Sequence, residues 1–570
     1  MSSITQKFWQ FKTPDPQKIV VLSDSLKLDP VVAQLLINRG IDDAKEAAVF
    51  LNPGLQFLHD PFRLKDMDRA VARIKKAADR REKVLIFGDY DVDGVTSSAL
   101  LFRLLRKMSI RAANHIPHRM QDGYGLNANA VNLARDEQAT LLISVDCGIT
   151  AVEEVKALNA AGIDVIIIDH HEPGAAGLPP AHAVIDPKRP DCAYPFKNLA
   201  SVGLVAKLFQ AIEGRIPDDI MDLVALGTIA DVVTLKGENR ILVKAGLPRL
   251  AATQNKGLAA LLDVAKLKGK PFKPHYAGFI IGPRINATGR MDSAGLSLKL
   301  LLTESDDEAY DLARQLEDLN ARRQQLQRGV VDEAVRMIEQ EVNFKDQKVI
   351  VVGKEGWHKG VLGIVASRVA DMYYRPSIIV SFEDGVGTAS ARSIAGFHLH
   401  EALTHCSELL ENFGGHQLAA GLTIRQDKLP NFRKLINDFA QDILQIRQLT
   451  PTLGVDCEIP LYGATLDLVN ILEQLEPFGE GNRPPLFASR RLMIKSRPVV
   501  LGRETLKFWV TDGRASVSAV GFGMGRYRDY LHQGQHVDLV YQLQIDDWNK
   551  APTVQLKLED IRESEESDKS

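Results

Sequence analysis

Acidic side chains that could bind a cation are concentrated in one turn in the first third of the chain. The segment FGDYDVDGVTS, residues 87–97, places Asp89, Asp91 and Asp93 at alternate positions directly after an apolar run. Carboxylates two residues apart can converge on a divalent cation when the turn curls, and Gly94 allows that curl. The turn is therefore a candidate metal site for phosphoryl chemistry.

Three other interpretations compete for this turn. The spacing matches the first half of an EF-hand calcium loop, but the twelfth position is Leu100 instead of Glu, and a β-branched and aromatic run precedes the loop. The segment 91–95 also fits an aspartyl nucleophile of the haloacid-dehalogenase type, which the local residues leave open. The turn could equally be a solvated acidic surface. Acids elsewhere in the chain must decide.

The turn lies within a regular alternation of strands and helices. The strands are rich in Val and Ile without interruption, which is typical of a parallel sheet buried on both faces. Ligands of such sheets bind beyond the carboxyl ends of the strands. The predicted elements are helix 69–83, strand 84–88, helix 96–108, strand 139–146, helix 151–162 and strand 164–171.

Each of the next two strands also ends in side chains that bind metals. Asp146 ends the second strand, the run Asp169, His170 and His171 ends the third, and Asp231 follows a further apolar segment that could be helix or strand. Like charges brought this close repel one another unless a cation compensates them. Carboxylate and imidazole ligands suit Mn²⁺ or Mg²⁺, and this number of donors suits two ions.

Eight segments carry a family resemblance. DYDVDG (89–94), SVDCGI (144–149), DHH (169–171) and GTIAD (227–231) resemble the four ordered motifs of the DHH phosphoesterase superfamily. A haloacid-dehalogenase nucleophile explains none of the last three. Further along, GPRINATGRM (282–291), GWHKGVLGIVASR (356–368), SARS (390–393) and FGGHQLAAG (413–421) resemble the DHH-associated domain of bacterial single-strand exonucleases in this superfamily.

The resemblance implies roles for the acids and imidazoles. The implied metal ligands are Asp91, Asp93, Asp146, His170 and Asp231. Asp146 is expected to bridge the two ions. His171 is expected to face the scissile phosphate as a catalytic residue, suited to charge stabilisation or proton transfer. Asp89 is grouped with it as a catalytic residue, either ligating a metal or supporting a ligand.

Phosphate-binding residues are expected in the later motifs. The candidates are Arg290, Ser390, Arg392, Gly415 and His416. Guanidinium groups bind phosphate bidentately, and glycines let a backbone approach a phosphate closely, although an isolated Arg is usually only surface and a glycine pair only a turn. Ala391 departs from the family pattern, where glycine is common, which affects the fine geometry of this motif.

The predicted fold class is α/β, with a parallel-sheet catalytic domain, an α/β DHH-associated domain joined to it by a long helix, and a C-terminal OB-like β-barrel. Phe508, Trp509, Phe522 and Trp548 could stack bases on that barrel, although at least half are expected in its core. The predicted segments are residues 1–68, which pack on the catalytic domain; 69–303, the catalytic domain; 304–341, a connecting helix; 342–448, the DHH-associated, nucleic-acid-binding domain; 452–562, the OB-like domain; and 563–570, an acidic tail.

Composition limits the remaining possibilities. A chain of 570 residues with 45% hydrophobic content can form about three or four domains. A net charge of −3 provides no general attraction to nucleic acid, so any polyanion site must be local. The four cysteines form no CxxC pair, which argues against a disulfide framework or a zinc site. No signal peptide and no apolar stretch of ~20 residues is evident, so we expect a soluble, cytoplasmic protein without membrane contacts.

These observations and the resemblance predict a metal-dependent exonuclease that hydrolyses single-stranded DNA. The 5′ to 3′ direction, the release of 5′-mononucleotides and a role in DNA repair and recombination rest on the resemblance, as does a cleft between the two α/β domains that admits one strand. Expected partners are single-stranded DNA, a single-strand-binding protein and a helicase, with the chain itself a monomer. The alternatives are an oligonucleotide or cyclic-dinucleotide phosphodiesterase, which the large third domain disfavours, and a non-catalytic replication scaffold, which would have lost the acids.

Overall fold

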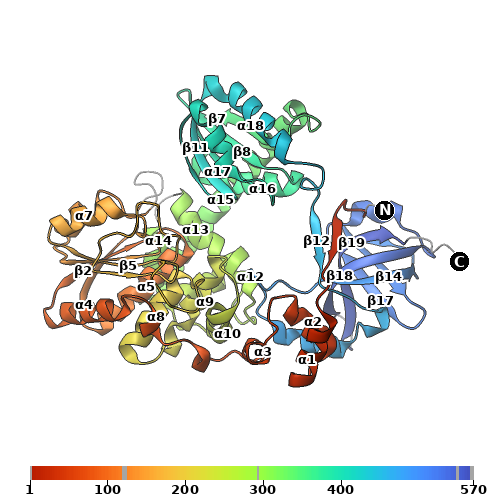
Figure 1. Ribbon diagram of the computed structural model, residues 1–570, viewed down its shortest axis with the longest axis horizontal. Helices are drawn as coiled ribbons and strands as arrows, with labels where there is room; N and C mark the ends of the chain where they lie inside the picture. The colour runs from red at the N-terminus through yellow and green to blue at the C-terminus, as the bar shows by residue number, and fades with distance from the viewer. Residues whose placement is uncertain (1–2, 118–124, 292–293, 503, 547–550, 565–570) are drawn as a thin grey trace. The chain divides into compact units, whose positions relative to one another are not determined.

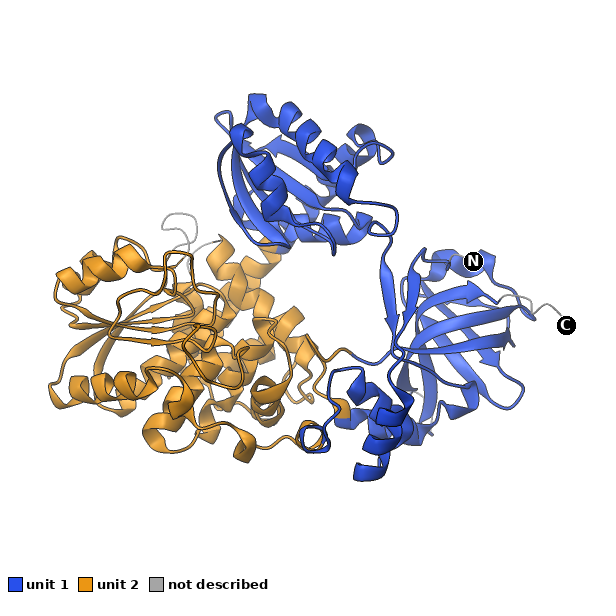
Figure 2. Cartoon of the chain, in the orientation of Figure 1, with its two compact units in different colours: residues 1–47, 324–474, 484–570 blue, residues 48–323, 475–483 orange. Residues whose placement is uncertain are grey.

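The computed structural model describes residues 3–117, 125–291, 294–502, 504–546 and 551–564. The chain divides into two compact units (Figure 2). Unit 1 contains residues 1–47, 324–474 and 484–570, and unit 2 contains residues 48–323 and 475–483.

Unit 2 is built on a five-stranded parallel sheet with the order β3-β2-β4-β5-β6. The uninterrupted Val and Ile content correctly predicts strands buried on both faces, because every residue of β4 is buried. The strands are β2 (Lys83–Gly88), β3 (Arg111–His115), β4 (Leu141–Val145), β5 (Asp164–Ile168) and β6 (Ala183–Ile185).

Helices cover both faces of this sheet (Figure 1). Alternate strand residues point to opposite sides, so Val84 and Ile86 of β2 belong to one core while Leu85 and Phe87 belong to the other. The first core includes α4 (Met67–Asp79), α5 (Val92–Lys107), α8 (Ser201–Glu213) and α9 (Met221–Ala230). The second core includes α6 (Ala130–Asp136) and α7 (Val152–Ala160).

The predicted helix 96–108 begins four residues earlier in the structure. Helix α5 starts at Val92, inside the acidic segment, and Asp91 caps it by accepting a hydrogen bond from the Gly94 amide. An N-cap carboxylate satisfies an otherwise unpaired amide of the first turn, which explains the early start. The segment before Asp231, which the sequence left open between helix and strand, is helix α9.

Helix α15 (Asp306–Glu341) is a single helix of 36 residues that contributes to both units. In unit 1 it is followed by a five-stranded sheet with the order β10-β11-β9-β8-β7, in which only the β7–β8 pair is parallel. The strands are β7 (Ile350–Glu355), β8 (Ser377–Glu383), β9 (Val386–Arg392), β10 (Leu410–Gly415) and β11 (Ala419–Arg425). Its helices are α16 (Leu362–Tyr373), α17 (Leu399–His405) and α18 (Leu429–Ile443).

The C-terminal strands of unit 1 close into a barrel. The sheet order is β13-β14-β18-β19-β17-β16-β15, and an additional β14–β16 pairing joins five of these strands into a ring, which is the OB-like architecture that was predicted. The strands are β13 (Cys457–Glu458), β14 (Phe487–Ile494), β15 (Val499–Leu501), β16 (Thr505–Thr511), β17 (Ser516–Gly521), β18 (His536–Asp546) and β19 (Thr553–Glu563). Helix α19 (Leu466–Leu472) lies near the predicted position, whereas β19 was not predicted.

The N-terminal segment differs from the expectation that residues 1–68 pack on the catalytic domain. Residues 3–47 group with unit 1 instead. Strand β1 (Phe8–Phe11) pairs in parallel with β12 (Thr452–Val455), and Trp9 is buried in the barrel cluster, where its Nε1 donates to Asp560 Oδ2 at 2.7 Å. A buried Trp needs an acceptor for its N–H, and Asp560 provides one. Of the predicted acidic tail, residues 565–570 lie outside the described residues.

Candidate metal centre and phosphate-binding residues

The predicted metal ligands gather at the point where the strand order of the parallel sheet reverses. From β2 the chain passes to β3 on one side. It then crosses to β4 on the other side of β2 and continues outward to β5. Open α/β sheets bind ligands at the carboxyl ends of the two strands that flank such a switch point. Asp89, Asp91 and Asp93 follow β2 and Asp146 follows β4, so sheet topology places these acids at the expected binding crevice.

Backbone amides hold the first acids of the cluster. Asp93 is fully buried, and its two carboxylate oxygens accept from the amides of Ser201 at 2.7 Å and Val202 at 2.8 Å, in the first turn of α8. The start of α5 lies against the preceding turn, because a Cβ on Gly94 would come within 2.4 Å of the Asp89 carbonyl oxygen. Gly94 therefore permits the turn predicted from the sequence.

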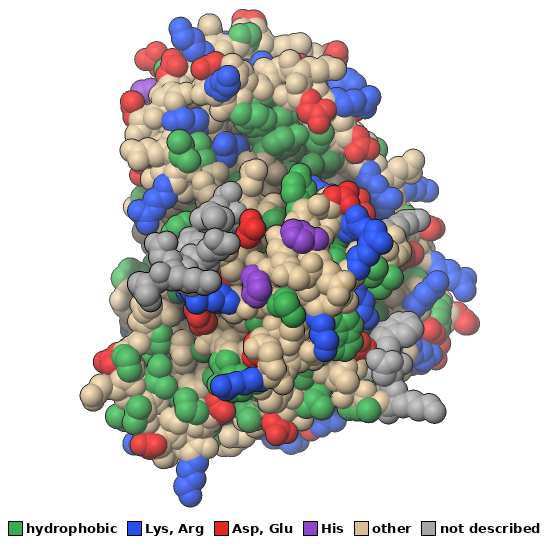
Figure 3. Space-filling model, turned by 90° about the vertical axis from the view of Figure 1, so that its right-hand side faces the viewer, with side chains coloured by type: hydrophobic (Ala, Val, Ile, Leu, Met, Phe, Trp, Pro, Cys, Tyr) green, Lys and Arg blue, Asp and Glu red, His purple; other side chains and the backbone are tan. Residues whose placement is uncertain are grey.

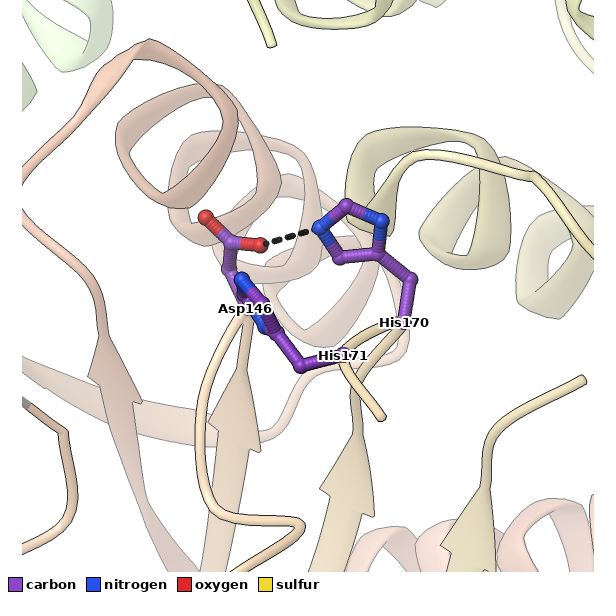
Figure 4. A group of neighbouring side chains, drawn as sticks. All are labelled: Asp146, His170 and His171. Carbon is purple, nitrogen blue, oxygen red and sulfur yellow. Dashed lines mark ion pairs between the residues drawn. The ribbon is translucent and has the colours of Figure 1, made fainter. Parts of the chain in front are cut away.

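His170 lies at the centre of the cluster (Figure 4). Its Nε2 is 3.3 Å from Asp146 Oδ1, 3.6 Å from Asp231 Oδ2 and 3.9 Å from Asp93 Oδ2. Asp146 adopts a left-handed backbone conformation, with a φ of 63°, and its amide donates to the Ile168 carbonyl. This backbone turn places the carboxylate beside the imidazole.

Three groups of side chains have ligand atoms close enough to share an ion, within 4.8 Å of one another in each group. The groups are Asp146 with His170 and His171, Asp93 with His170 and Asp231, and Asp89 with Asp91 and Asp146. Asp146 and His170 each belong to two of the groups, so the three groups are contiguous. The structure thus brings together every side chain predicted as a metal ligand or as a catalytic residue.

The acids of the cluster are buried close together, so their charged forms require a cation to compensate them. Burial and the neighbouring Asp91 raise the pKa of Asp93 to about 7, and burial and Asp93 raise the pKa of Asp231 to about 9 and that of Asp146 well above its usual range. Burial lowers the pKa of His170 to about 4, so this imidazole is neutral at pH 7, as a ligand must be.

Three buried ligand atoms also point to a missing partner. In the described part of the chain, Asp146 Oδ1, His170 Nε2 and Asp231 Oδ2 are buried and have no hydrogen-bond partner. Buried polar atoms without a partner are costly unless something else satisfies them. Oxygen and imidazole donors in this number fit divalent ions such as Mn²⁺ or Mg²⁺.

Asp169 orients His171, a role that sequence reasoning did not assign to it. Its Oδ1 lies 2.7 Å from His171 Nδ1 and also accepts from the His170 amide, while Oδ2 accepts from the Ile149 amide. Burial opposes charge on both groups, but the hydrogen bond between them raises the pKa of His171 and lowers the pKa of Asp169. His171 itself is exposed.

A fourth strand of the sheet, β6, also ends in an acid that the sequence analysis passed over. Asp186 directly follows β6, is fully buried, and accepts from the Lys188 amide at 2.7 Å. Burial raises its pKa to about 7. The signal was present in the sequence, because Asp186 ends the apolar run 183–185 just as Asp146 ends its own strand.

The phosphate-binding candidates lie in both units. Arg290 stands near the end of α13 (Gly282–Met291) in unit 2, next to Gly289, whose added Cβ would come within 3.1 Å of the Tyr90 carbonyl oxygen. Because Tyr90 lies between Asp89 and Asp91, this close contact places the end of α13 against the acidic turn.

Ser390 and Arg392 share one face of β9 in unit 1, and Arg392 Nη1 donates to Ser390 Oγ at 3.4 Å and to the Ala391 carbonyl at 2.8 Å. The side chain of Ala391 points the other way, into the core of the sheet, so it fits where the family has glycine. Ser390 pairs across the sheet with Gly421, which pairs with Gly414.

Gly415 and His416 end β10 at a hairpin. Gly415 has a φ of 142°, and a Cβ there would come within 2.4 Å of the Ala419 carbonyl oxygen, so the turn itself requires glycine at this position. His416 is exposed, and its amide donates to the Ala419 carbonyl. Lys and Arg side chains are interspersed with acidic and hydrophobic ones over the face shown in Figure 3, so the charges on this face are mixed in sign.

The barrel aromatics divide between core and surface. Phe508 is buried, whereas Trp509 is 45% and Phe522 61% exposed. Trp548 lies outside the described residues. Among the helices of the described residues, none has the length and apolar character needed to span a membrane.

The parallel sheet and its acid–imidazole cluster define the class of protein, a DHH-type phosphoesterase domain. Family models match in the same order as the predicted motifs: the DHH family N-terminal domain at residues 83–228, the DHHA1 domain at 346–442 and the RecJ OB domain at 455–560.

Relatives of nearly full length define the family more narrowly. The chain is 38% identical over 98% of its length to the single-stranded-DNA-specific exonuclease RecJ of Bacillus subtilis, covering 71% of that protein. It is 31% identical to the enzyme of the same description from Escherichia coli, covering 94% of this chain and 96% of that protein. The crystal structure of RecJ from Thermus thermophilus in complex with Mn²⁺ matches with a TM-score of 0.84 and 30% identity, over 98% of this chain and 80% of that one. The chain belongs to the RecJ family.

Proposed function

We propose that this protein is a metal-dependent exonuclease that hydrolyses the phosphodiester bonds of single-stranded DNA in the 5′ to 3′ direction and releases 5′-mononucleotides. The observation that carries the proposal is the buried cluster of carboxylates around His170 at the switch point of the sheet, in which Asp146 Oδ1, His170 Nε2 and Asp231 Oδ2 have no hydrogen-bond partner among the described residues. The substrate follows from the RecJ relatives, which are named for single-stranded DNA.

The ligand set fits two divalent ions, Mn²⁺ or Mg²⁺. We assign Asp91, Asp93, Asp146, His170 and Asp231 to them, with Asp146 between the two. Such ions supply Lewis acidity toward the phosphoryl oxygens when bound. Mn²⁺ and Mg²⁺ occur in RecJ structures from Thermus thermophilus.

His171 is proposed to act on the substrate directly. Asp169 binds its Nδ1 side, so the Nε2 side of the exposed ring is the one that can reach a phosphoryl oxygen. The raised pKa of His171 favours the protonated ring, which can donate a hydrogen bond to a developing negative charge. Asp89 is proposed as a supporting carboxylate beside Asp91 and Asp146.

Strand binding is assigned to groups outside the metal cluster. We propose that Arg290, Ser390, Arg392, Gly415 and His416 contact phosphates, and that exposed Trp509 and Phe522 stack bases. We assign catalysis to residues 69–303, nucleic-acid binding to 342–448 with helix 304–341 as the connection, and further strand binding to 452–562.

The cellular setting is also a proposal. We propose a monomer that acts in DNA repair and recombination in the cytoplasm, beside a single-strand-binding protein and a helicase; the RecJ relatives are named for their exonuclease activity on single-stranded DNA, which is compatible with such a role. Pull-down of each candidate partner with the purified full chain, at physiological salt, would test these assignments.

The function is tested with end-labelled single strands, duplexes and dinucleotides, in Mn²⁺, Mg²⁺ or chelator. We expect single strands to be degraded from the 5′ end only when metal is present. Asp91→Ala should lower the rate by orders of magnitude while strand binding persists, and Asp146→Asn should retain no more activity, since it removes the shared ligand. Near wild-type turnover of purified Asp91→Ala, or a preference for dinucleotides over long strands, would contradict the proposal.

Recognition of the 5′ end has its own test, because a terminal phosphate carries more charge than an internal one. Arg392→Ala and Arg290→Ala should each remove a charge-assisted hydrogen bond of about 1.5–3 kcal/mol, or roughly ten- to a hundredfold in kcat/KM. If these residues read the end, the loss should be larger on 5′-phosphorylated than on 5′-hydroxyl strands. An equal loss on both would make them general backbone contacts.

A further inference from the structure

One short segment of the C-terminal region is built into the catalytic unit. Residues 475–483, here called the strap, belong to unit 2, although the residues on either side of them in sequence belong to unit 1. None of the sequence motifs includes the strap, and its role in the proposed chemistry is not evident from its composition.

A buried guanidinium fixes the strap to unit 2. Arg240 is 1% exposed and donates from Nη1 to the Leu475 carbonyl and from Nη2 to the Glu476 carbonyl, each at 2.9 Å, while its Nε donates to the Phe50 carbonyl at 2.8 Å. Within the strap, Asn482 Nδ2 donates to the Leu475 carbonyl at 2.8 Å. A buried Arg requires acceptors for its donors, so the strap carbonyls are part of the structure of unit 2.

The strap lies directly against the loop that follows the metal ligand Asp231. The Leu235 amide donates to the Glu480 carbonyl at 2.7 Å. Strap glycines allow this approach, because a Cβ on Gly481 would come within 2.1 Å of Thr234 Oγ1 and a Cβ on Gly479 within 2.5 Å of Leu235 Cδ1. Residues 234–235 are therefore held by the strap backbone.

The same loop carries backbone strain next to the metal ligand. Val232 adopts a φ of 62°, which a β-branched residue rarely does, and its side chain is 63% exposed, so packing does not hold it there. Such a conformation persists only where the flanking structure fixes it. On the N-terminal side, the amides of Asp231 and Val232 donate to α9 carbonyls. On the C-terminal side, the Thr234 carbonyl accepts from Asn239 Nδ2 at 3.1 Å and the Leu235 amide donates to the strap.

We propose that the strap is a positioning element for Asp231. By fixing Leu235 and Thr234, it holds the strained turn at Val232 and so keeps the Asp231 carboxylate beside His170. The C-terminal region then contributes to metal affinity as well as to strand binding. This inference rests on the metal site of the proposed function.

The test compares two glycines with the same backbone conformation in the full-length protein. Gly481 has a φ of 70° and meets Thr234, whereas Gly523 has a φ of 69° and no atom within 4 Å of an added Cβ. We expect Gly481→Ala to weaken Mn²⁺ binding by about ten- to a hundredfold in titration calorimetry. Amide exchange at Leu235 should quicken, and KM for the strand should not change. Gly523→Ala should leave Mn²⁺ affinity and Leu235 exchange at wild-type values.

A second substitution that removes the clash gives a further test of the proposal. Thr234→Ala removes the oxygen that an alanine at 481 would strike, so the double variant should recover most of the Mn²⁺ affinity. If Gly481→Ala fails to fold, Gly479→Ala is the second variant: its Cβ would press on the buried Leu235 side chain and should weaken Mn²⁺ binding in the same direction. Equal Mn²⁺ affinity in Gly481→Ala and Gly523→Ala, or no recovery in the double variant, would overturn the proposal. A wild-type chain that binds Mn²⁺ but leaves single strands intact would instead refute the proposed function alone.

Discussion

At the scale of single residues, neighbouring groups determine what each acid of the cluster can do. Asp93 is held by two amides of α8, and Asp91 caps α5, so neither carboxylate can turn away from the site. The sequence could predict that the acids and imidazoles gather, because strand ends in a parallel sheet share one edge. It could not show that Asp169 orients His171, since that depends on the direction of two side chains in space.

Asp231→Asn should make the metal-free protein more stable. Burial and Asp93 raise the pKa of Asp231 to about 9, so the folded chain keeps a proton that the unfolded chain releases above its ordinary pKa of 3.8. This group therefore favours folding below pH 4 and loses that contribution as pH rises toward 9. Asn has no carboxyl group to ionise, so the variant does not lose this contribution to the free energy of unfolding. We therefore expect a higher Tm in chelator at pH 8.

The same variant should lose the stabilisation by Mn²⁺, which for wild type is about 2.7 kcal/mol at a free concentration of 100 times Kd. Scanning calorimetry with chelator and with Mn²⁺ measures both effects. Asp218→Asn serves as a control, because Asp218 is exposed and pairs with Arg249 on the surface. A full Mn²⁺ shift in Asp231→Asn would remove this residue from the ligand set.

At the scale of elements, strands β2, β4 and β5 of the parallel sheet were predicted within a few residues because their Val and Ile runs are unambiguous, whereas β3 and β6 were not predicted. Helix α5 was predicted to begin too late, since Val92 and Gly94 are poor helix formers, although Asp91 is a good N-cap residue. Strand β19 was missed although residues 555–558 alternate polar with apolar side chains, as a half-buried strand does; the adjacent acids Glu559 and Asp560 interrupt this alternation, and the pairing with β18 is visible only in the fold.

Gly94→Ala should disrupt the junction between β2 and α5. An added Cβ would meet the Asp89 backbone at 2.4 Å, and backbone cannot yield as a flexible side chain does. Overpacking of this kind costs about 1–3 kcal/mol, and the displaced acidic turn should also lose activity. Gly329→Ala is the matched control, because Gly329 lies within helix α15 with no atom within 4 Å, and should gain about 0.5–1 kcal/mol. Urea unfolding measures both, and equal effects would contradict the close contact.

At the scale of the whole molecule, the order of the domains follows from motifs that occur in sequence. The contacts between segments that are distant in sequence cannot be predicted from these motifs. Trp9 and Asp560 are 551 residues apart, and Arg240 binds carbonyls about 235 residues later, so no local pattern could indicate either contact. The sequence accordingly placed residues 452–562 in one OB-like segment and residues 1–68 on the catalytic domain, whereas residues 475–483 belong to unit 2 and residues 3–47 to unit 1.

A chain ending at Gln448 should therefore lose catalysis as well as strand affinity. It lacks the strap, so Arg240 loses its acceptors at Leu475 and Glu476 and the loop after Asp231 loses its bond to Glu480. We expect weaker Mn²⁺ binding and little cleavage even of dinucleotides, which are too short to need the barrel. Full-length Trp509→Ala should behave differently, losing about 1–3 kcal/mol of affinity for long strands with unchanged dinucleotide cleavage. If the truncated chain is folded by circular dichroism, binds Mn²⁺ normally and cleaves dinucleotides at the full-length rate, the C-terminal region serves strand binding only.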